Sequence, residues 1–243
     1  MIPPDHPRFR SLEVRERMAW FAREGVVSHE GLAAHGRGEA FDYLLGERTT
    51  ESALLAERTA AALLLSARHP VISVNGNTAA LAGREIRDLQ RATGAVVEVN
   101  LFHRTPERLE KVTRLLEGYG VEVLEGEEER LIPVSHDRGW SHRDGAAAAD
   151  VVLVPLEDGD RAEALVRMGK SIIAIDLNPL SRTAQAATLT IVDEVTRAIP
   201  AITMAAGTLT RTEGEKLISR LDNSYFLQAA RDEMAARLTH ALD

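Results

Sequence analysis

Residues 35–49 concentrate ionisable side chains around two glycines that flank Arg37. An arginine offers a planar fork of N–H donors for phosphate or carboxylate groups, and glycine lets the backbone approach a ligand closely. His35 and Glu39 add groups that can accept a proton in the same stretch. The pattern predicts a ligand-binding loop, and the alternative is a solvated turn held by Glu–Arg pairs.

A second candidate site lies in residues 172–184, where an apolar run stops at Asp176, turns at Asn178 and restarts as a helix. An acidic residue at the carboxyl end of a buried strand can accept hydrogen bonds from ribose hydroxyls. Arg182 and Thr183, at the start of the next helix, can meet a phosphate. The segment predicts a nucleotide site, and the alternative is an Asx-Pro turn that only ends a strand.

A third group of polar residues follows the first two predicted strands. Residues 73–80 join a strand to a helix, although they lack the G-x-G-x-x-G pattern, so a helix-capping turn is the alternative. Because open α/β sheets bind ligands beyond the carboxyl ends of their strands, we expect these side chains to face a substrate crevice. The residues concerned are Asn75, Asn77, Thr78, His103 and Arg104.

An acidic turn at residues 155–161 again follows a strand and precedes a helix. The carboxylates of Glu157, Asp158 and Asp160 offer the oxygen ligands that Mg²⁺ prefers. Acidic residues at a helix N-terminus are equally typical of caps that complement the helix dipole. Both interpretations stay open, and the metal ligands are unknown.

The elements that must position these residues alternate between short β-rich runs and helical patterns. The strands are predicted at 71–74, 96–99, 121–124, 151–154, 172–176 and 189–192, and the helices between them at 78–91, 106–119, 161–168 and 181–187. Continuous apolar runs are typical of strands buried on both faces, and the alternation implies right-handed βαβ crossovers. We therefore predict an α/β fold with a Rossmann-like, doubly wound, mainly parallel sheet.

Flanking segments are predicted to be helical. Residues 1–70 contain helices at 12–23 and 50–67, joined by the connection that bears the ligand loop, and residues 201–243 contain helices at 213–221 and 224–242. The core is expected at 71–200, with 125–150 as a long polar loop or insertion. All three segments are expected to pack as one compact unit.

Composition narrows the function classes. The chain has 243 residues, no cysteine and a net charge of −8, so disulfides and thiolate chemistry are excluded and nucleic acid is not expected as a partner. No apolar run approaches the roughly 20 residues that span a bilayer, and the first residues do not form a signal peptide. A cytoplasmic protein without membrane contacts is expected.

Five segments together resemble the archaeal phosphopantothenate synthetase family, the 4-phosphopantoate–β-alanine ligases. They are residues 35–49, 71–80, 99–104, 150–159 and 176–183, and the match runs over most of residues 5–200. The resemblance implies a homodimer that makes 4′-phosphopantothenate for coenzyme A from ATP, 4-phosphopantoate and β-alanine. It implies ATP contacts at Arg15, Arg37, Asp176, Leu177, Asn178, Arg182, Thr183, Glu194 and Val195.

The implied chemistry needs no protein nucleophile. The substrate carboxylate would attack the α-phosphate of ATP to give an acyl adenylate and diphosphate, and the amine of β-alanine would then displace AMP. Arg37, together with Mg²⁺, would neutralise charge, and Glu39, Glu47 or His35 would take the amine proton. A nicotinamide-dependent Rossmann oxidoreductase and a non-catalytic nucleotide-sensing module are the alternative functions, since Asp176 can bind a ribose in each.

Overall fold

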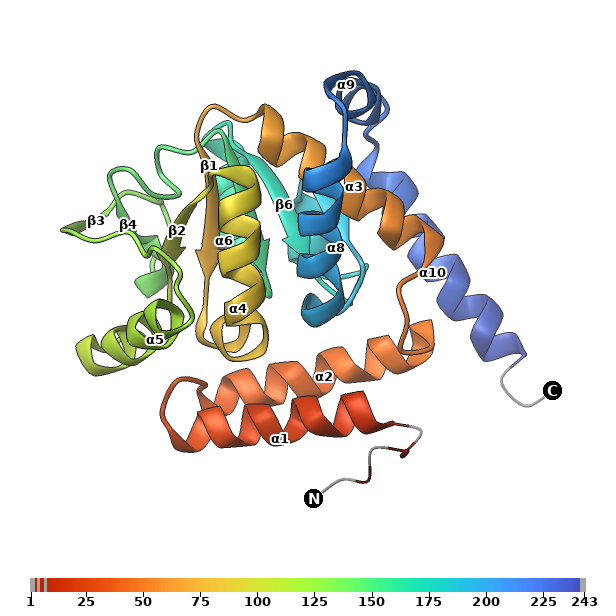
Figure 1. Cartoon of the computed structure of the whole chain (residues 1–243), viewed down its shortest axis with the longest axis horizontal. Helices are drawn as coiled ribbons and strands as arrows, with labels where there is room; N and C mark the ends of the chain where they lie inside the picture. The colour runs from red at the N-terminus through yellow and green to blue at the C-terminus, as the bar shows by residue number, and fades with distance from the viewer. Residues whose placement is uncertain (1–2, 4, 7, 241–243) are drawn as a thin grey trace.

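A parallel sheet forms the centre of the molecule. The computed structural model describes residues 3, 5–6 and 8–240, and within them five strands pair in the order β2-β1-β5-β6-β7 (Figure 1). The strands are β1 (Pro70–Val74), β2 (Val96–Val99), β5 (Val151–Pro155), β6 (Ser171–Ile175) and β7 (Leu189–Ile191). Every neighbouring pair is parallel, and the chain order 2-1-3-4-5 is that of a doubly wound fold. The predicted fold class is confirmed.

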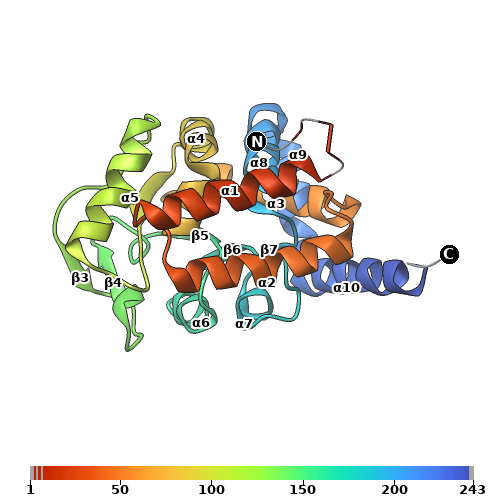
Figure 2. The same cartoon turned by 90° about the horizontal axis from the view of Figure 1, so that it is seen from below.

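Helices cover both faces of this sheet. They are α1 (Phe9–Arg23), α2 (His29–Leu45), α3 (Glu51–Ser66), α4 (Gly76–Thr93), α5 (Pro106–Gly118), α6 (Gly159–Arg167), α7 (Arg182–Ala186), α8 (Val195–Thr208), α9 (Arg211–Ser219) and α10 (Asn223–Thr239). Figure 2 shows α4 and α8 on one side of the strands and α6 and α7 on the other. Alternate strand residues follow this division, with Ile72 in the larger core under α3, α4 and α8 and Val71 in the smaller core near α6.

The sheet is narrower than predicted at one edge. Residues 121–124 make only a single parallel bridge, between Val97 and Val123, instead of a sixth strand. The side chain of Gln90 bonds both the N–H and the carbonyl oxygen of Glu122, which diverts these groups from a strand ladder. The predicted loop at 125–150 contains a short antiparallel hairpin, β3 (Glu128–Arg130) and β4 (Trp140–His142), with a 3₁₀ turn before β4.

Two helices were missing from the sequence prediction. The stretch around Arg37 is part of α2, not a loop: Ser28 caps its start by accepting from Gly31 N, and Gly46 ends it at φ 89°. Leu45 is its one buried residue in the described structure, so no apolar stripe marked it. Helix α8 carries Pro200 in its interior and crosses the boundary predicted at that residue.

None of the helices in the described ranges has both the length and the apolar composition needed to cross a membrane.

Candidate functional site

A large cavity lies where the α1–α2 hairpin faces the carboxyl ends of the strands. Its volume is about 1480 Å³. Pockets for one small molecule usually enclose roughly 300–1,000 Å³, so this cavity has room for more than one substrate. Each sheet strand is followed by a residue that lines it, namely Asn75, Leu101, Leu156, Asp176 and Asp193.

Helix α2 forms one wall by crossing this edge of the sheet (Figure 1). At its start the side chain of Asn77 donates to the carbonyl of Gly31, and a Cβ on Gly31 would lie 2.4 Å from Asn77 Oδ1. Towards its end, Asp42 accepts from Arg197 of α8. The two contacts hold opposite ends of α2 over different strands, so its central residues face the cavity.

The carboxylate of Asp176 is built into the turn after β6. It accepts from the Ser181 hydroxyl and, at 2.9 Å, from the N–H of Asn178. Burial raises the pKa of Asp176, while these two hydrogen bonds and the positive charge of Arg37 act in the opposite direction. Asp176, Leu177 and Asn178, the strand end at which ATP contacts are expected, all line the cavity.

The neighbouring turns bring the other predicted nucleotide residues to the same end. Glu194 caps α8 by accepting from Thr196 N, and burial raises the pKa of its carboxyl group. Val195 lies beside it on the cavity wall. Thr183 donates to the carbonyl of Glu157 at 2.8 Å, and Arg182 pairs with Glu163 on the surface of α6 at 2.9 Å.

The turn after β1 joins the two halves of the sheet. Asn75 caps α4 by accepting from Thr78 N, and its amide donates to the carbonyls of Pro155 and Leu156 after β5. This is the point at which a doubly wound sheet changes direction and binds ligands. Asn75, Asn77 and His103 line the cavity, whereas Thr78 is fully buried with its hydroxyl bonded to Asn75.

Among the residues of α2 that line the cavity, the three predicted to take part in catalysis differ in their contacts. Arg37 makes no hydrogen bond or ion pair with any described residue, so its guanidinium is available to a ligand. Glu39 already pairs with Arg15, at 2.7 Å, and accepts from Ser11. Burial lowers the pKa of His35, which keeps its ring neutral, and its Nε2 has no hydrogen-bond partner within the described chain.

Two further predicted residues are not brought to the cavity wall. Arg15 points to Glu39 from α1 and does not line the cavity. Arg104 lies over the ring of Trp140, 5.5 Å from its centroid, and pairs with Glu128 of the hairpin. The hairpin that holds Arg104 lies in a segment predicted as a long polar loop or insertion, so this partner was not predicted from the sequence.

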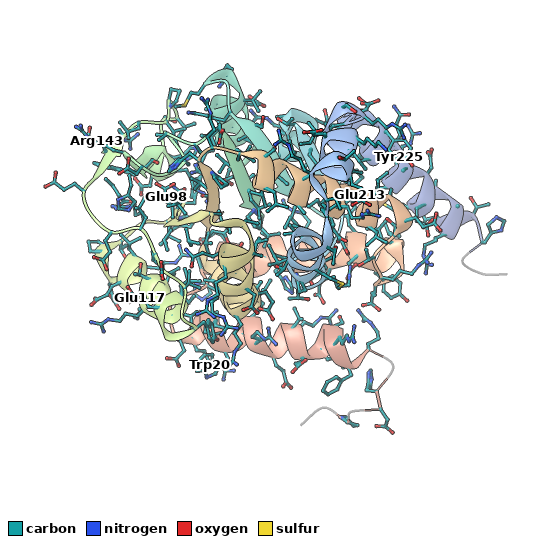
Figure 3. All side chains as sticks on the ribbon, turned by 45° about the horizontal axis from the view of Figure 1, so that its top comes forward. Trp20, Glu98, Glu117, Arg143, Glu213 and Tyr225 are labelled. Atoms are coloured by element: carbon teal, nitrogen blue, oxygen red, sulfur yellow. The ribbon has the colours of Figure 1, made fainter. Side chains whose placement is uncertain are left out.

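The acidic turn at 155–161 is a structural network and does not gather carboxylates around a metal. Glu157 pairs with Arg138 and Arg161, and Asp160 accepts from His136 at 2.7 Å. Arg161 also faces the fully buried Glu98, which Figure 3 labels in the interior of the molecule. No group of three His, Asp or Glu side chains in the described ranges could hold a metal ion.

Sequence reasoning missed several arginines and acids that line the cavity. Arg197 pairs with Asp42 and Asp193, and Arg108 and Arg138 lie at the opposite end of the cavity. A cation in the first turn of a helix opposes the helix dipole, so the position of Arg108 in α5 was a usable signal. The others depend on contacts between distant segments.

The fold and the cavity define an α/β protein that binds ligands at the switch point of a doubly wound sheet. The family described as Phosphopantothenate/pantothenate synthetase matches residues 52–237, and the chain belongs to this family. It is 58% identical to the 4-phosphopantoate–β-alanine ligase of Methanospirillum hungatei over 100% of both chains. The enzymes of the same name from Methanosarcina mazei (98% of this chain, 95% of the relative) and Thermococcus kodakarensis (98% and 94%) are 51% and 48% identical. These comparisons support neither the oxidoreductase nor the nucleotide-sensing module.

Proposed function

We propose that the chain is a 4-phosphopantoate–β-alanine ligase, which makes 4′-phosphopantothenate, AMP and diphosphate for coenzyme A biosynthesis. The observation that carries this proposal is the 58% identity with a ligase of that name over the full length of both chains. The cavity of about 1480 Å³ is lined by residues that follow each strand of the sheet, and it is large enough to hold a nucleotide together with a second substrate.

ATP would occupy the end of the cavity beyond β6 and β7. Asp176 and Asn178 would meet the ribose, and Glu194 and Val195 would line the adjacent wall. Among the described residues Arg37 has no hydrogen-bond or ion-pair partner, and its positive charge acts on Asp176 at this end, so it would contact the phosphates. Asn75, Asn77 and His103, at the other end, would contact the phosphopantoate.

The reaction proceeds in two balanced steps. A carboxylate oxygen of phosphopantoate bonds to the α-phosphorus of ATP, and diphosphate leaves. The nitrogen of β-alanine then bonds to the acyl carbon, AMP leaves with that oxygen, and the amine proton passes to a base. The protein supplies orientation and positive charge at the point where negative charge develops.

His35 is the best-placed base among the three candidates. Glu47 is held by Arg8, whose hydrogen bond lowers the pKa of the glutamate, and Glu39 is held by Arg15. The carboxylates of both are therefore already engaged by arginines. His35 is neutral because burial lowers its pKa, and its Nε2 is free within the described chain to accept a proton once the substrates have reached it.

Mg²⁺ is expected with ATP and not as a resident of the protein. The described residues contain no converging set of three acidic or histidine side chains. Magnesium bound to nucleotides takes many of its ligands from phosphates and water, so one or two carboxylates would suffice.

Product analysis tests the reaction. With heavy oxygen in the carboxylate of phosphopantoate, mass spectrometry should find the label in AMP and find unlabelled diphosphate. Label in inorganic phosphate, with release of ADP, would contradict the adenylate route, and absence of any ATP- and β-alanine-dependent product would contradict the ligase itself.

A homodimer in the cytoplasm remains part of this proposal. The exposed apolar side chains Leu54 and Leu65 on α3 and Met204 on the adjacent α8 are consistent with a covered surface. Light scattering at micromolar concentration should give twice the monomer mass of 26.6 kDa, and a value near the monomer mass would contradict the dimer.

A further inference from the structure

Arg108 lies where its surroundings disfavour a positive charge. It lies in the first turn of α5, where the partial positive charge of the helix dipole disfavours a cation. Its pKa is lowered, first by burial and then by the nearby positive charge of Arg138, while Glu30 acts in the opposite direction. A cation held in such a place is compensated when an anion binds between the positive groups.

Two hydrogen bonds hold the guanidinium of Arg108 in place, and one of its terminal nitrogens has no acceptor among the described residues. Its Nε donates to the carbonyl of Val26 at 3.1 Å, and one terminal nitrogen donates to the carbonyl of His103 at 2.9 Å. The other terminal nitrogen, Nη2, lies beside Gly76, where an added Cβ would be only 2.8 Å away. Among the described residues, Nη2 has no hydrogen-bond partner, and Arg108 has no carboxylate within ion-pair distance.

Arg138 shows by contrast what a structural arginine looks like in this cavity. Its Nε donates to Asp158 at 2.9 Å, and it pairs with Glu157 at 3.2 Å. Its Nη1 also donates to two oxygens of Asn100, the backbone carbonyl and the side-chain amide oxygen. Arg138 therefore needs no ligand, whereas Arg108 is bonded only to neutral carbonyls.

The surroundings of Arg108 suit a phosphate monoester. His103 and Gly76 line the same end of the cavity. The first N–H groups of α4 have no acceptor within the helix, and the cap residue Asn75 accepts from that of Thr78, so among the described residues those of Gly76 and Asn77 are left for a ligand. Phe102, 43% exposed, supplies an apolar surface beside them. This end lies beyond β1 and β2, whereas Asp176 lies beyond β6 at the nucleotide end.

We propose that Arg108 recognises the phosphate of the acyl substrate and thereby determines the preference for 4-phosphopantoate over pantoate. This inference rests on the proposed ligase function. The family description covers both phosphopantothenate and pantothenate synthetases, so membership alone does not decide which of the two acids is used. A residue that contacts the phosphate decides it.

The test compares Arg108→Ala and Arg108→Lys with Arg114→Ala, an exposed arginine of the same helix that pairs with Glu110. Titration calorimetry gives the dissociation constants of 4-phosphopantoate, pantoate, inorganic phosphate and ATP. Arg108→Ala should raise the dissociation constant of 4-phosphopantoate by about 10- to 100-fold and that of pantoate by less than about threefold. Arg108→Lys should give an intermediate loss, and Arg114→Ala none. ATP affinity should stay constant in all three variants.

Two results would overturn the assignment. One is an equal loss of affinity for 4-phosphopantoate and pantoate, and the other is an unchanged affinity for 4-phosphopantoate in a folded variant. If Arg108→Ala does not fold, the same two affinities measured on Arg108→Lys decide. Wild-type protein that forms no AMP would refute the ligase function separately, and the binding of inorganic phosphate would still show whether Arg108 holds an anion.

Discussion

The two ends of the cavity contain buried ionisable groups of opposite sign, and burial shifts the pKa of each group towards its neutral form. At the β6–β7 end, burial raises the pKa of Asp176 and Glu194, which favours their neutral forms. At the β1–β2 end, burial and the charge of Arg138 lower the pKa of Arg108. In both places the protein holds a charge that its own partners do not fully compensate.

From this difference we infer the direction in which the substrates would lie in the cavity. Hydroxyl donors of a ribose would compensate the acidic end, and a phosphate monoester would compensate the basic end. The group that reacts on each substrate would then lie between the ends, below the central part of α2. Helix α2 spans this distance, from Gly31 against Asn77 to Asp42 against Arg197.

The largest expected effect is at the middle of the cavity. Arg37→Ala should lower the rate of AMP formation by about 10- to 100-fold for each charged hydrogen bond lost, because the guanidinium has no structural partner among the described residues to mask its role. Steady-state kinetics and a thermal melt would check both parts. Arg48→Ala is the matched control, since Arg48 follows α2 and pairs with Glu233 outside the cavity. Wild-type kinetics in a folded Arg37→Ala variant would contradict a role for Arg37 in substrate binding or catalysis.

A smaller effect is expected at the acidic end alone. Asp176→Ala should weaken ATP binding by about 10-fold, with little change for 4-phosphopantoate, because a ribose would lose a charged acceptor. Asp176→Asn keeps one oxygen that can accept from Asn178 N–H and so separates ligand binding from the shape of the turn. Calorimetry with each substrate decides. Unchanged ATP affinity contradicts the ribose assignment, and equal losses for both substrates would show that the two ends are not independent.

The strands of the sheet could be predicted from the sequence because the pattern that marks a buried strand lies within a few consecutive residues. Five runs of β-rich residues form buried strands, and the first four are followed by helices that the sequence predicts, such as α5 with Pro106 in its first turn. The sixth run, 121–124, is similar in composition, but the backbone N–H and carbonyl oxygen of Glu122 are bonded to the side chain of Gln90. Composition cannot reveal a side chain that replaces a strand partner.

Part of the site could also be predicted, because the position of some of its residues depends only on the strand that precedes them. Residues that directly follow a strand, such as Asn75 and Asp176, must lie at the carboxyl edge of the sheet, and they do. Arg104 also follows a strand, but Glu128 and Trp140 hold it away from the cavity wall. Arg197 meets Asp42 across 155 positions of sequence, and no local pattern predicts such a pair.

A third carboxylate extends the acidic end into the core. Glu57 of α3 is completely buried, and neither of its oxygens has a hydrogen-bond partner among the described residues. Burial, followed by the negative charge of Asp193, raises its pKa to about 9, against the positive charge of Arg197. Asp193 accepts hydrogen bonds from Thr49, from Arg197 and from the N–H of Glu194. Glu57 is therefore the neutral member of this group at neutral pH.

The smallest effect on turnover, and the clearest effect of pH, is expected for Glu57→Gln. The usual pKa of a glutamate is 4.5, so between that value and about 9 the folded protein keeps a proton that the unfolded chain loses. The free energy of unfolding should therefore fall as the pH rises through this window, by at most about 1.4 kcal/mol per pH unit from this group. Glutamine cannot ionise and has nearly the same shape.

The variant should match the wild type near pH 5, become the more stable protein towards pH 8, and keep its activity at pH 7. Urea denaturation from pH 5 to pH 9 measures the difference, with Glu51→Gln, an exposed residue of the same helix, as the control. Parallel stability curves for Glu57→Gln and wild type would show that Glu57 is ionised in the folded protein. The acidic end would then carry one more buried negative charge, and its contrast with the arginine end would be larger than we infer.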